Sequence, residues 1–170
     1  MNKKQKGFSL IELLIVVAII LIIAAIAIPN LLRARMAANE SSAVGSVRTI
    51  VTSEVSYTST WGQGFAVAIT NLGGATPCVA SAATSCFLDP LLSVAPNQKS
   101  GYTVSANGLG GAGTAASPNT AFVAAAVPIT VGTTGQRSFC SDETGVIRFD
   151  AAGGGAPASD TACQVFPSLQ

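Results

Sequence analysis

The feature that most constrains this chain is one long apolar run near its start. The run extends from Phe8 to Ile28, FSLIELLIVVAIILIIAAIAI, and Glu12 is its single charged residue. A helix of this length, at about 1.5 Å per residue, spans the roughly 30 Å hydrocarbon layer of a bilayer. The run therefore predicts a transmembrane helix, with the rest of the chain folded outside the lipid.

Three lysines, Lys3, Lys4 and Lys6, precede the apolar run. By the positive-inside rule they predict that the N-terminus stays in the cytoplasm and that the following residues are exported. A cleaved secretory signal peptide is the alternative, and residues 24–27 could mimic its small-residue cleavage site. The length of the run favours an anchor, because the apolar part of a signal peptide is shorter.

Glu12 is unusual inside this run. A carboxylate in a membrane-spanning helix costs about 2.5–3.5 kcal/mol on insertion scales, and such residues usually mark a function or a paired partner. The alternative is that Glu12, near one end of the span, reaches the lipid headgroups and is tolerated there. Glu12 taken alone leaves both explanations open.

Composition argues against several functions. The sequence has no histidine, which removes the commonest general base and the commonest transition-metal ligand. Without the three leader lysines, six basic and eight acidic residues remain, a net charge of −2 and no basic surface for nucleic acid. We expect no enzyme activity, no cofactor, no metal and no nucleic acid as primary partner.

Beyond the apolar run a second helical stretch is predicted. Pro29 predicts a kink or a melted stretch near residues 25–29, and the strong helix formers of residues 31–38 favour a bend over a break. The helix is expected to run to about Tyr57 and to pack on a sheet. Its apolar stripe is predicted from four valines at helical spacing, Val44, Val47, Val51 and Val55.

The remaining sequence predicts a small β-rich head. Residues 61–64, WGQG, break the helical pattern, and a loop region is expected to extend through Pro96. Strands are predicted at residues 101–106 and 121–129, followed by a hairpin of residues 137–140 and 146–149 around the turn 141–145. The expected fold class is α+β, with an antiparallel sheet of three or four strands.

One short motif carries a family resemblance. The residues from Lys6 to Glu12, KGFSLIE, resemble the processing signature of type IV pilins and of the pseudopilins of type II secretion. The resemblance extends to about Ile50 and is strongest to type IVa pilins. It implies that a prepilin peptidase and methyltransferase cuts between Gly7 and Phe8 and N-methylates Phe8, and that Glu12 supports assembly.

The resemblance also implies a type IV pilin fold divided into four segments. They are a leader at 1–7, a transmembrane and filament-core helix at 8–28, an amphipathic helix at 29–60 and a head at 61–170. Pro29 lies where helices of this family lose regularity in filaments, so it is expected to assist assembly. The implied partners are further copies of the chain in a helical filament, the pilus assembly platform and, before assembly, the inner membrane, with an extracellular location afterwards.

The head contains four cysteines, which permit three pairings. Cys78 and Cys86 are separated by seven residues, and a disulfide between them could staple the loop region. The family's C-terminal disulfide loop implies that Cys140 pairs with Cys163.

Charge pairing gives the apolar helix a second role in a filament. Cleavage frees a cationic amine on Phe8, and that amine can pair with Glu12 of a neighbouring subunit and set the axial register. Arg33 and Arg35 could contact headgroups, or could pair with Glu40 or Glu54 of another subunit.

Three further patterns favour a structural explanation. Residues 108–113 fit G-x-G-x-x-G, but no helix and no suitably placed acid follow, so a flexible loop is expected. Asn39 begins an N-glycosylation sequon that its helical setting makes a coincidence. The acids Asp142, Glu143, Asp150 and Asp160 lack a calcium-loop spacing, and a solvated turn is the favoured interpretation.

The leading hypothesis is a structural subunit of a type IV pilus, for which adhesion or motility would be properties of the polymer. A pseudopilin of a type II secretion system is the alternative, although Cys140 and Cys163 favour a pilin, because family pseudopilin heads often bind calcium and lack this disulfide. A membrane-anchored enzyme or ligand-binding domain is a third, remote hypothesis.

Overall fold

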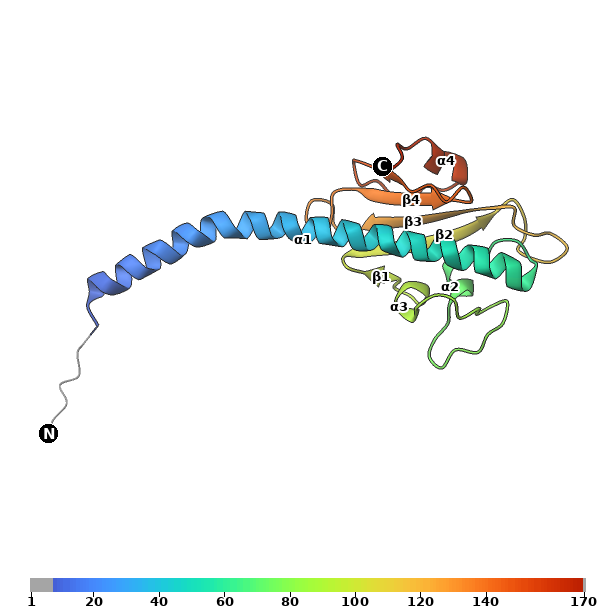
Figure 1. Ribbon diagram of the computed structural model, residues 1–170, viewed down its shortest axis with the longest axis horizontal. Coiled ribbons are helices and arrows are strands. Elements are labelled where there is room, and N and C mark those ends of the chain that lie inside the picture. The colour runs from blue at the N-terminus through green and yellow to red at the C-terminus, as the bar shows by residue number, and fades with distance from the viewer. Residues whose placement is uncertain (1–7, 170) are drawn as a thin grey trace. The chain divides into compact units, whose positions relative to one another are not determined.

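The computed structural model describes residues 8–169, which fall into two units that divide between Arg35 and Met36. The first unit is the N-terminal part of helix α1 (Figure 1). The second unit, called the head from here on, contains the rest of α1 and everything that follows it. The elements in chain order are α1 (Leu10–Trp61), α2 (Ile69–Leu72), α3 (Pro90–Ser93), β1 (Gln98–Lys99), β2 (Tyr102–Leu109), β3 (Ala121–Pro128), β4 (Ser138–Asp142), β5 (Arg148–Asp150) and α4 (Asp160–Gln164). This α+β architecture confirms the expected fold class.

Helix α1 is continuous through Pro29. The melted stretch considered for residues 25–29 is not present in the described residues. A proline removes only one helical hydrogen bond, and strong helix formers follow Pro29. The helix ends at Trp61, four residues beyond the expected Tyr57. Gly62 stops it by adopting a left-handed conformation, φ +64°, while its N–H donates to the carbonyl of Thr58 at 3.2 Å.

The sheet has five antiparallel strands in the order β1-β2-β3-β4-β5, so the prediction of three or four strands was wrong. The missed strand is β1, which has only two residues and therefore shows no alternation that sequence could reveal. β2 and β3 form the longest pairing, from Tyr102 opposite Pro128 to Leu109 opposite Ala121. β2 therefore extends three residues past the predicted 101–106.

The predicted hairpin exists with shifted bounds. β4 runs to Asp142, which places two residues of the expected turn inside a strand, and β5 begins only at Arg148. Phe139 lies opposite Phe149 in its register. The shift arises because Ser141 and Asp142 pair with β3, at Ala124 and Val123, a tertiary contact that local turn chemistry does not report.

The sheet buries both faces, and β3 shows this most clearly. Alternate β3 residues, Phe122, Ala124 and Ala126, belong to the core that α1 covers, and the intervening Val123 and Ala125 belong to a second core. That second core contains the Cys140–Cys163 disulfide and is flanked by Phe166. The uninterrupted apolar pattern of β3 follows from this two-sided burial.

The predicted valine stripe of α1 is confirmed at three of its four positions and wrong at Val55. Val47 is fully buried and Val44 and Val51 are partly buried, but Val55 is 59% exposed. The residues that α1 buries are Glu40, Ala43, Ser46, Val47, Ile50, Ser53, Glu54 and Tyr57. Two carboxylates and two serines lie on this buried face. Apolar residues alone therefore do not define the buried face of α1.

We expect two valines of α1 to respond differently to truncation. Val47→Ala should lower the free energy of unfolding by about 2 kcal/mol because it leaves a cavity in the core. Val55→Ala should change it by no more than about 0.5 kcal/mol, because the side chain is exposed. Chemical denaturation of the full chain in mild detergent measures both, and equal losses would contradict this assignment of the buried face.

Candidate functional site

The N-terminal unit presents an unburied apolar surface. Phe8 is 77% exposed, and none of the most apolar window of α1 is buried within the chain. α1 is long and apolar enough near its N-terminus to cross a membrane, judged by length and composition. Leaving this much apolar surface in water is unfavourable, so the segment requires lipid or other protein chains around it.

Local hydrogen bonds define where α1 begins. The N–H of Leu13 donates to the carbonyl of Ser9 at 3.2 Å, and the N–H of Ser9 donates to Oε2 of Glu12 at 3.0 Å. The second bond is the backward half of a capping box, in which an acid three residues into the helix satisfies the cap's own N–H. Glu12 therefore helps to fix the start of α1 after Ser9, and Phe8 lies outside the helix. Gly7 lies outside the described residues.

Arg33 and Arg35 lie on the exposed surface of α1 after Pro29. Within residues 8–169 neither arginine forms an ion pair. Both guanidinium groups are therefore available to partners that lie outside this chain.

Glu40 joins α1 to the start of β4. Its Oε1 accepts hydrogen bonds from the backbone N–H groups of Gln136 and Arg137 at 3.0 and 3.2 Å, and its Oε2 accepts from Nε and Nη2 of Arg137 at 2.9 and 2.7 Å. Burial opposes ionisation of Glu40, but these bonds and the Arg137 charge outweigh it and lower the pKa of the carboxyl. The guanidinium also lies over the rings of Phe139 and Phe149, at 5.6 and 5.3 Å from their centroids.

Glu54 differs from Glu40, because its pKa is raised and not lowered. The residue is fully buried, and its Oε2 accepts one hydrogen bond, from the N–H of Ala66 at 2.8 Å. Its Oε1 has no hydrogen-bond partner among residues 8–169. Burial raises the pKa of Glu54 from 4.5 to about 7, and the Ala66 bond offsets this only in part. Burial also raises the pKa of Tyr57, and the nearby Glu54 charge adds to that increase.

The structure places Glu40 and Glu54 inside the head, so the idea that they pair with Arg33 or Arg35 of another subunit was wrong. A signal was present in the sequence. Residues 40, 43, 47, 50, 54 and 57 alternate in steps of three and four and so share one face of a helix. Acids in such a row indicate buried carboxylates with partners in the head.

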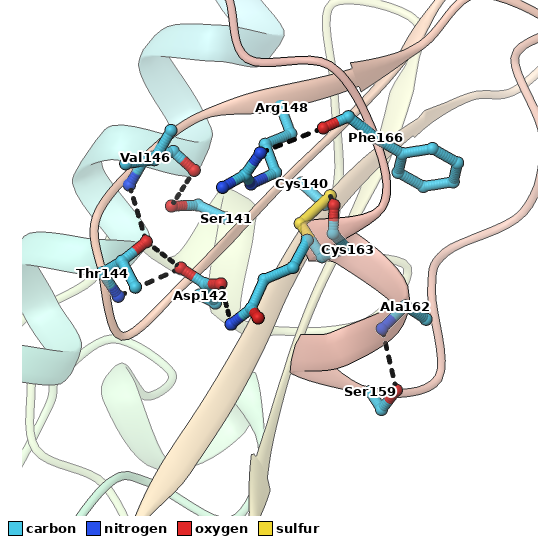
Figure 2. The surroundings of a disulfide bond; sticks show 11 residues. Cys140, Ser141, Asp142, Thr144, Val146, Arg148, Ser159, Ala162, Cys163 and Phe166 are labelled. Atoms are coloured by element: carbon cyan, nitrogen blue, oxygen red, sulfur yellow. Dashed lines mark hydrogen bonds between the residues drawn. A yellow bond between two sulfur atoms is a disulfide. The ribbon is translucent and has the colours of Figure 1, made fainter.

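Two disulfides join Cys78 to Cys86 and Cys140 to Cys163. The second one ties α4 to β4 on the face of the sheet away from α1 (Figure 2). It is fully buried, since Cys140 and Cys163 are 1% and 0% exposed.

The C-terminal loop is also held by Asp142. This carboxylate accepts hydrogen bonds from the hydroxyl and N–H of Thr144 (Figure 2). It also accepts one from Nε2 of Gln164, at 2.8 Å. Burial opposes its ionisation, but these bonds and the nearby Arg148 lower its pKa. Asp142 is 0% exposed, so the interpretation of this residue as part of a solvated turn was wrong.

The remaining acids do not converge. Oxygens of Asp150 accept from the N–H groups of Ala152 and Gly154, and Asp160 lies in the first turn of α4. Across residues 8–169, no group of three or more metal-ligating side chains comes together.

Two other motifs have structural roles. Nδ2 of Asn39, the sequon asparagine, donates to the carbonyl of Thr134 at 2.8 Å, which joins α1 to the β3–β4 loop. In the glycine-rich motif, Gly108 lies in β2 and a side chain there would collide with Asn119. The glycine allows Asn119 to approach the strand and donate to the carbonyl of Phe65 at 2.9 Å.

Comparisons with known proteins place the strongest similarity at the N-terminus. Residues 2–28 match the family described as "Prokaryotic N-terminal methylation motif". The chain is 45% identical over 56 residues to the "Type IV major pilin protein PilA" of Myxococcus xanthus, a segment covering 33% of this chain and 26% of the relative. It is 64% identical over 39 residues to the "Type IV wide pilus major component PilA4" of Thermus thermophilus, covering 23% and 30%.

These matches span about a quarter to a third of the curated relatives' own length. No solved structure gives a significant match. The similarity therefore concerns the N-terminal helix, and the head is known from its fold.

The chain therefore combines an exposed apolar helix that matches a methylation motif with a small disulfide-bonded antiparallel head. In its N-terminal part it is similar to two type IV pilins.

Glu54 predicts a loss of stability as pH rises. Its folded pKa of about 7 exceeds its ordinary 4.5, so the folded head binds this proton more tightly than the unfolded chain does. The free energy of unfolding should fall between about pH 4.5 and 7, by up to roughly 3 kcal/mol, and then level off. Glu54→Gln should remove most of this dependence, as measured by thermal unfolding at a series of pH values. An unchanged slope in the variant would contradict it.

Glu40 predicts a loss of stability as pH falls. Its folded pKa is depressed, so its contribution is present above about pH 4.5 and is lost as pH falls through the folded pKa. Glu40→Gln should lower the free energy of unfolding by about 1 kcal/mol at pH 7, and this loss should shrink as the pH falls below 4.5 and the wild-type carboxyl becomes protonated. Glu143→Gln, at an exposed position, is the control, and equal effects from both substitutions would count against the role of the ion pair.

Proposed function

We propose that this protein is a structural subunit of a type IV pilus. The observation that carries the proposal is the apolar α1 segment, which matches the methylation motif and is left unburied by the part of the chain that the structure describes. The names of the two relatives, a major pilin and a major component of a wide pilus, support a structural rather than enzymatic role.

Processing is the first step of the proposed pathway. A prepilin peptidase removes residues 1–7 by cutting between Gly7 and Phe8, and the new N-terminal Phe8 is N-methylated. The motif match across residues 2–28 supports this step. The exposure of Phe8 and its position outside helix α1 also support it, because a peptidase requires access to the residues next to the scissile bond.

Assembly then follows from charge and burial. The hydrogen bond of Glu12 to Ser9 uses Oε2, so Oε1 can accept the Phe8 amine of a neighbouring subunit. Removal of both charges from water is costly, but the two charges compensate when they are paired. Pairing at one level of the helix bundle sets the axial register, while the apolar side chains of residues 8–28 replace contacts with lipid by contacts with other copies.

The proposed locations follow the same order. Before assembly, residues 8–28 span the inner membrane with the leader lysines in the cytoplasm. The assembly platform then extracts the subunit, and Pro29 assists by allowing α1 to lose regularity as it enters the filament. Arg33 and Arg35 contact headgroups in the first state and neighbouring subunits in the second.

Glu12→Ala tests the proposed function. The variant should still be cleaved after Gly7, but the yield of sheared filaments should fall about tenfold or more because the Phe8 amine loses its partner. Electron microscopy of sheared filaments and mass spectrometry of the subunit N-terminus provide the measurement.

Glu143→Ala, which removes an exposed carboxylate from the head, is the matched control and should assemble normally. Normal assembly of Glu12→Ala would refute the register role. Wild-type subunits that keep Met1–Gly7, or that enter no fibre, would refute the pilus proposal itself.

A further inference from the structure

The two disulfides of the head differ in solvent access. Cys140 and Cys163 are 1% and 0% exposed in the second core of the sheet, with Val123 and Ala125 against them. Cys78 and Cys86 are both exposed residues in the loop region between α2 and α3. A thiolate must reach a sulfur atom to cleave a disulfide. Of the two disulfides, only Cys78–Cys86 is therefore open to attack.

The surroundings of the exposed disulfide also permit attack. No charged side chain occurs from Asn71 to Leu88, so nothing nearby in sequence repels an anionic thiolate. Val79, next to Cys78, is 78% exposed, which shows that the loop is open on this side. Gly74 lies against the sulfur of Cys78, where a side chain would collide with it. The backbone is therefore close to one side of this sulfur, while Cys78 and Cys86 are both exposed residues.

The loop closed by Cys78 and Cys86 has hydrogen bonds that do not depend on the disulfide. The Tyr57 hydroxyl of α1 donates to the carbonyl of Ala82 at 2.8 Å. Ser81 and Thr84 form a tight turn with two backbone hydrogen bonds, at 2.9 and 3.1 Å. These contacts tie the middle of the loop to the head, so cleavage of the disulfide frees the loop without removing its attachment to α1.

From this contrast we infer that Cys78–Cys86 is a site of thiol–disulfide exchange with a small external thiol, whereas Cys140–Cys163 is not. A thiolate attacks one sulfur and forms a mixed disulfide, and the other cysteine leaves as a thiolate. A second thiolate resolves the mixed disulfide, so that one external disulfide is formed and both cysteines are reduced. The inference goes beyond the pilus proposal and holds whether or not the chain polymerises.

The exchange changes one surface of the head and leaves its cores intact. Residues 79–85 lose their covalent closure, while the five-stranded sheet keeps its register and its buried disulfide. The affected surface carries the exposed side chains of Val79 and Phe87, so any contact made there becomes sensitive to thiols.

The test uses the full chain in mild detergent. The protein is incubated with reduced glutathione at pH 8, and samples are quenched with N-ethylmaleimide and mapped by mass spectrometry. Cys78 and Cys86 should be labelled at least about tenfold faster than Cys140 and Cys163. In 8 M urea, where burial no longer protects either pair, the two rates should converge.

A ratio below tenfold in the folded chain, or earlier labelling of Cys140 and Cys163, overturns the inference. The double variant Cys78→Ser, Cys86→Ser provides the second measurement. It should keep the far-ultraviolet circular dichroism of the parent and exchange the amide hydrogens of residues 79–85 at least about threefold faster, with β2 and β3 unchanged. Loss of the fold, or unchanged exchange in the loop, contradicts the proposed local effect.

Discussion

Burial of apolar surface along α1 is the constraint on which the rest of the structure depends. In the head, one face of this helix is covered by the sheet, where Val47 and Ile50 are fully buried. From Phe8 to Ile28 the side chains are not buried by other residues of the described range 8–169. One helix thus combines a segment stabilised by its own domain with a segment that needs lipid or other subunits, and this combination underlies the proposed passage from membrane to filament.

Three carboxylates lie in the interior of the head and affect its stability. Glu40 and Asp142 are surrounded by donors that keep them ionised, and each joins segments that are distant in sequence. Glu54 has one donor and a raised pKa, so its burial costs stability in the ionised form. Glu40 and Glu54 therefore give the stability of the head opposite pH dependences from the same face of α1, and Asp142 adds to the Glu40 effect from β4.

The second face of the sheet explains the C-terminal region. β3 is buried on both sides, and the far side needs a cover that α1 cannot provide. The buried Cys140–Cys163 bond and the Asp142–Gln164 hydrogen bond hold α4 over that side. The exposed Cys78–Cys86 bond closes a surface loop instead, so two bonds of one chemical type have different consequences because their burial differs.

The sequence by itself determined the apolar span, the processing motif, the α+β class and the end of α1 near Gly62, because these depend on composition and local backbone preference. Only the tertiary structure decided which face of α1 is buried, that β1 joins the sheet, and that β4 extends through Asp142. It also decided the partners of Glu40 and Glu54, which come from segments 12 to 97 residues away. Such contacts depend on the packing of distant segments, which local patterns do not encode.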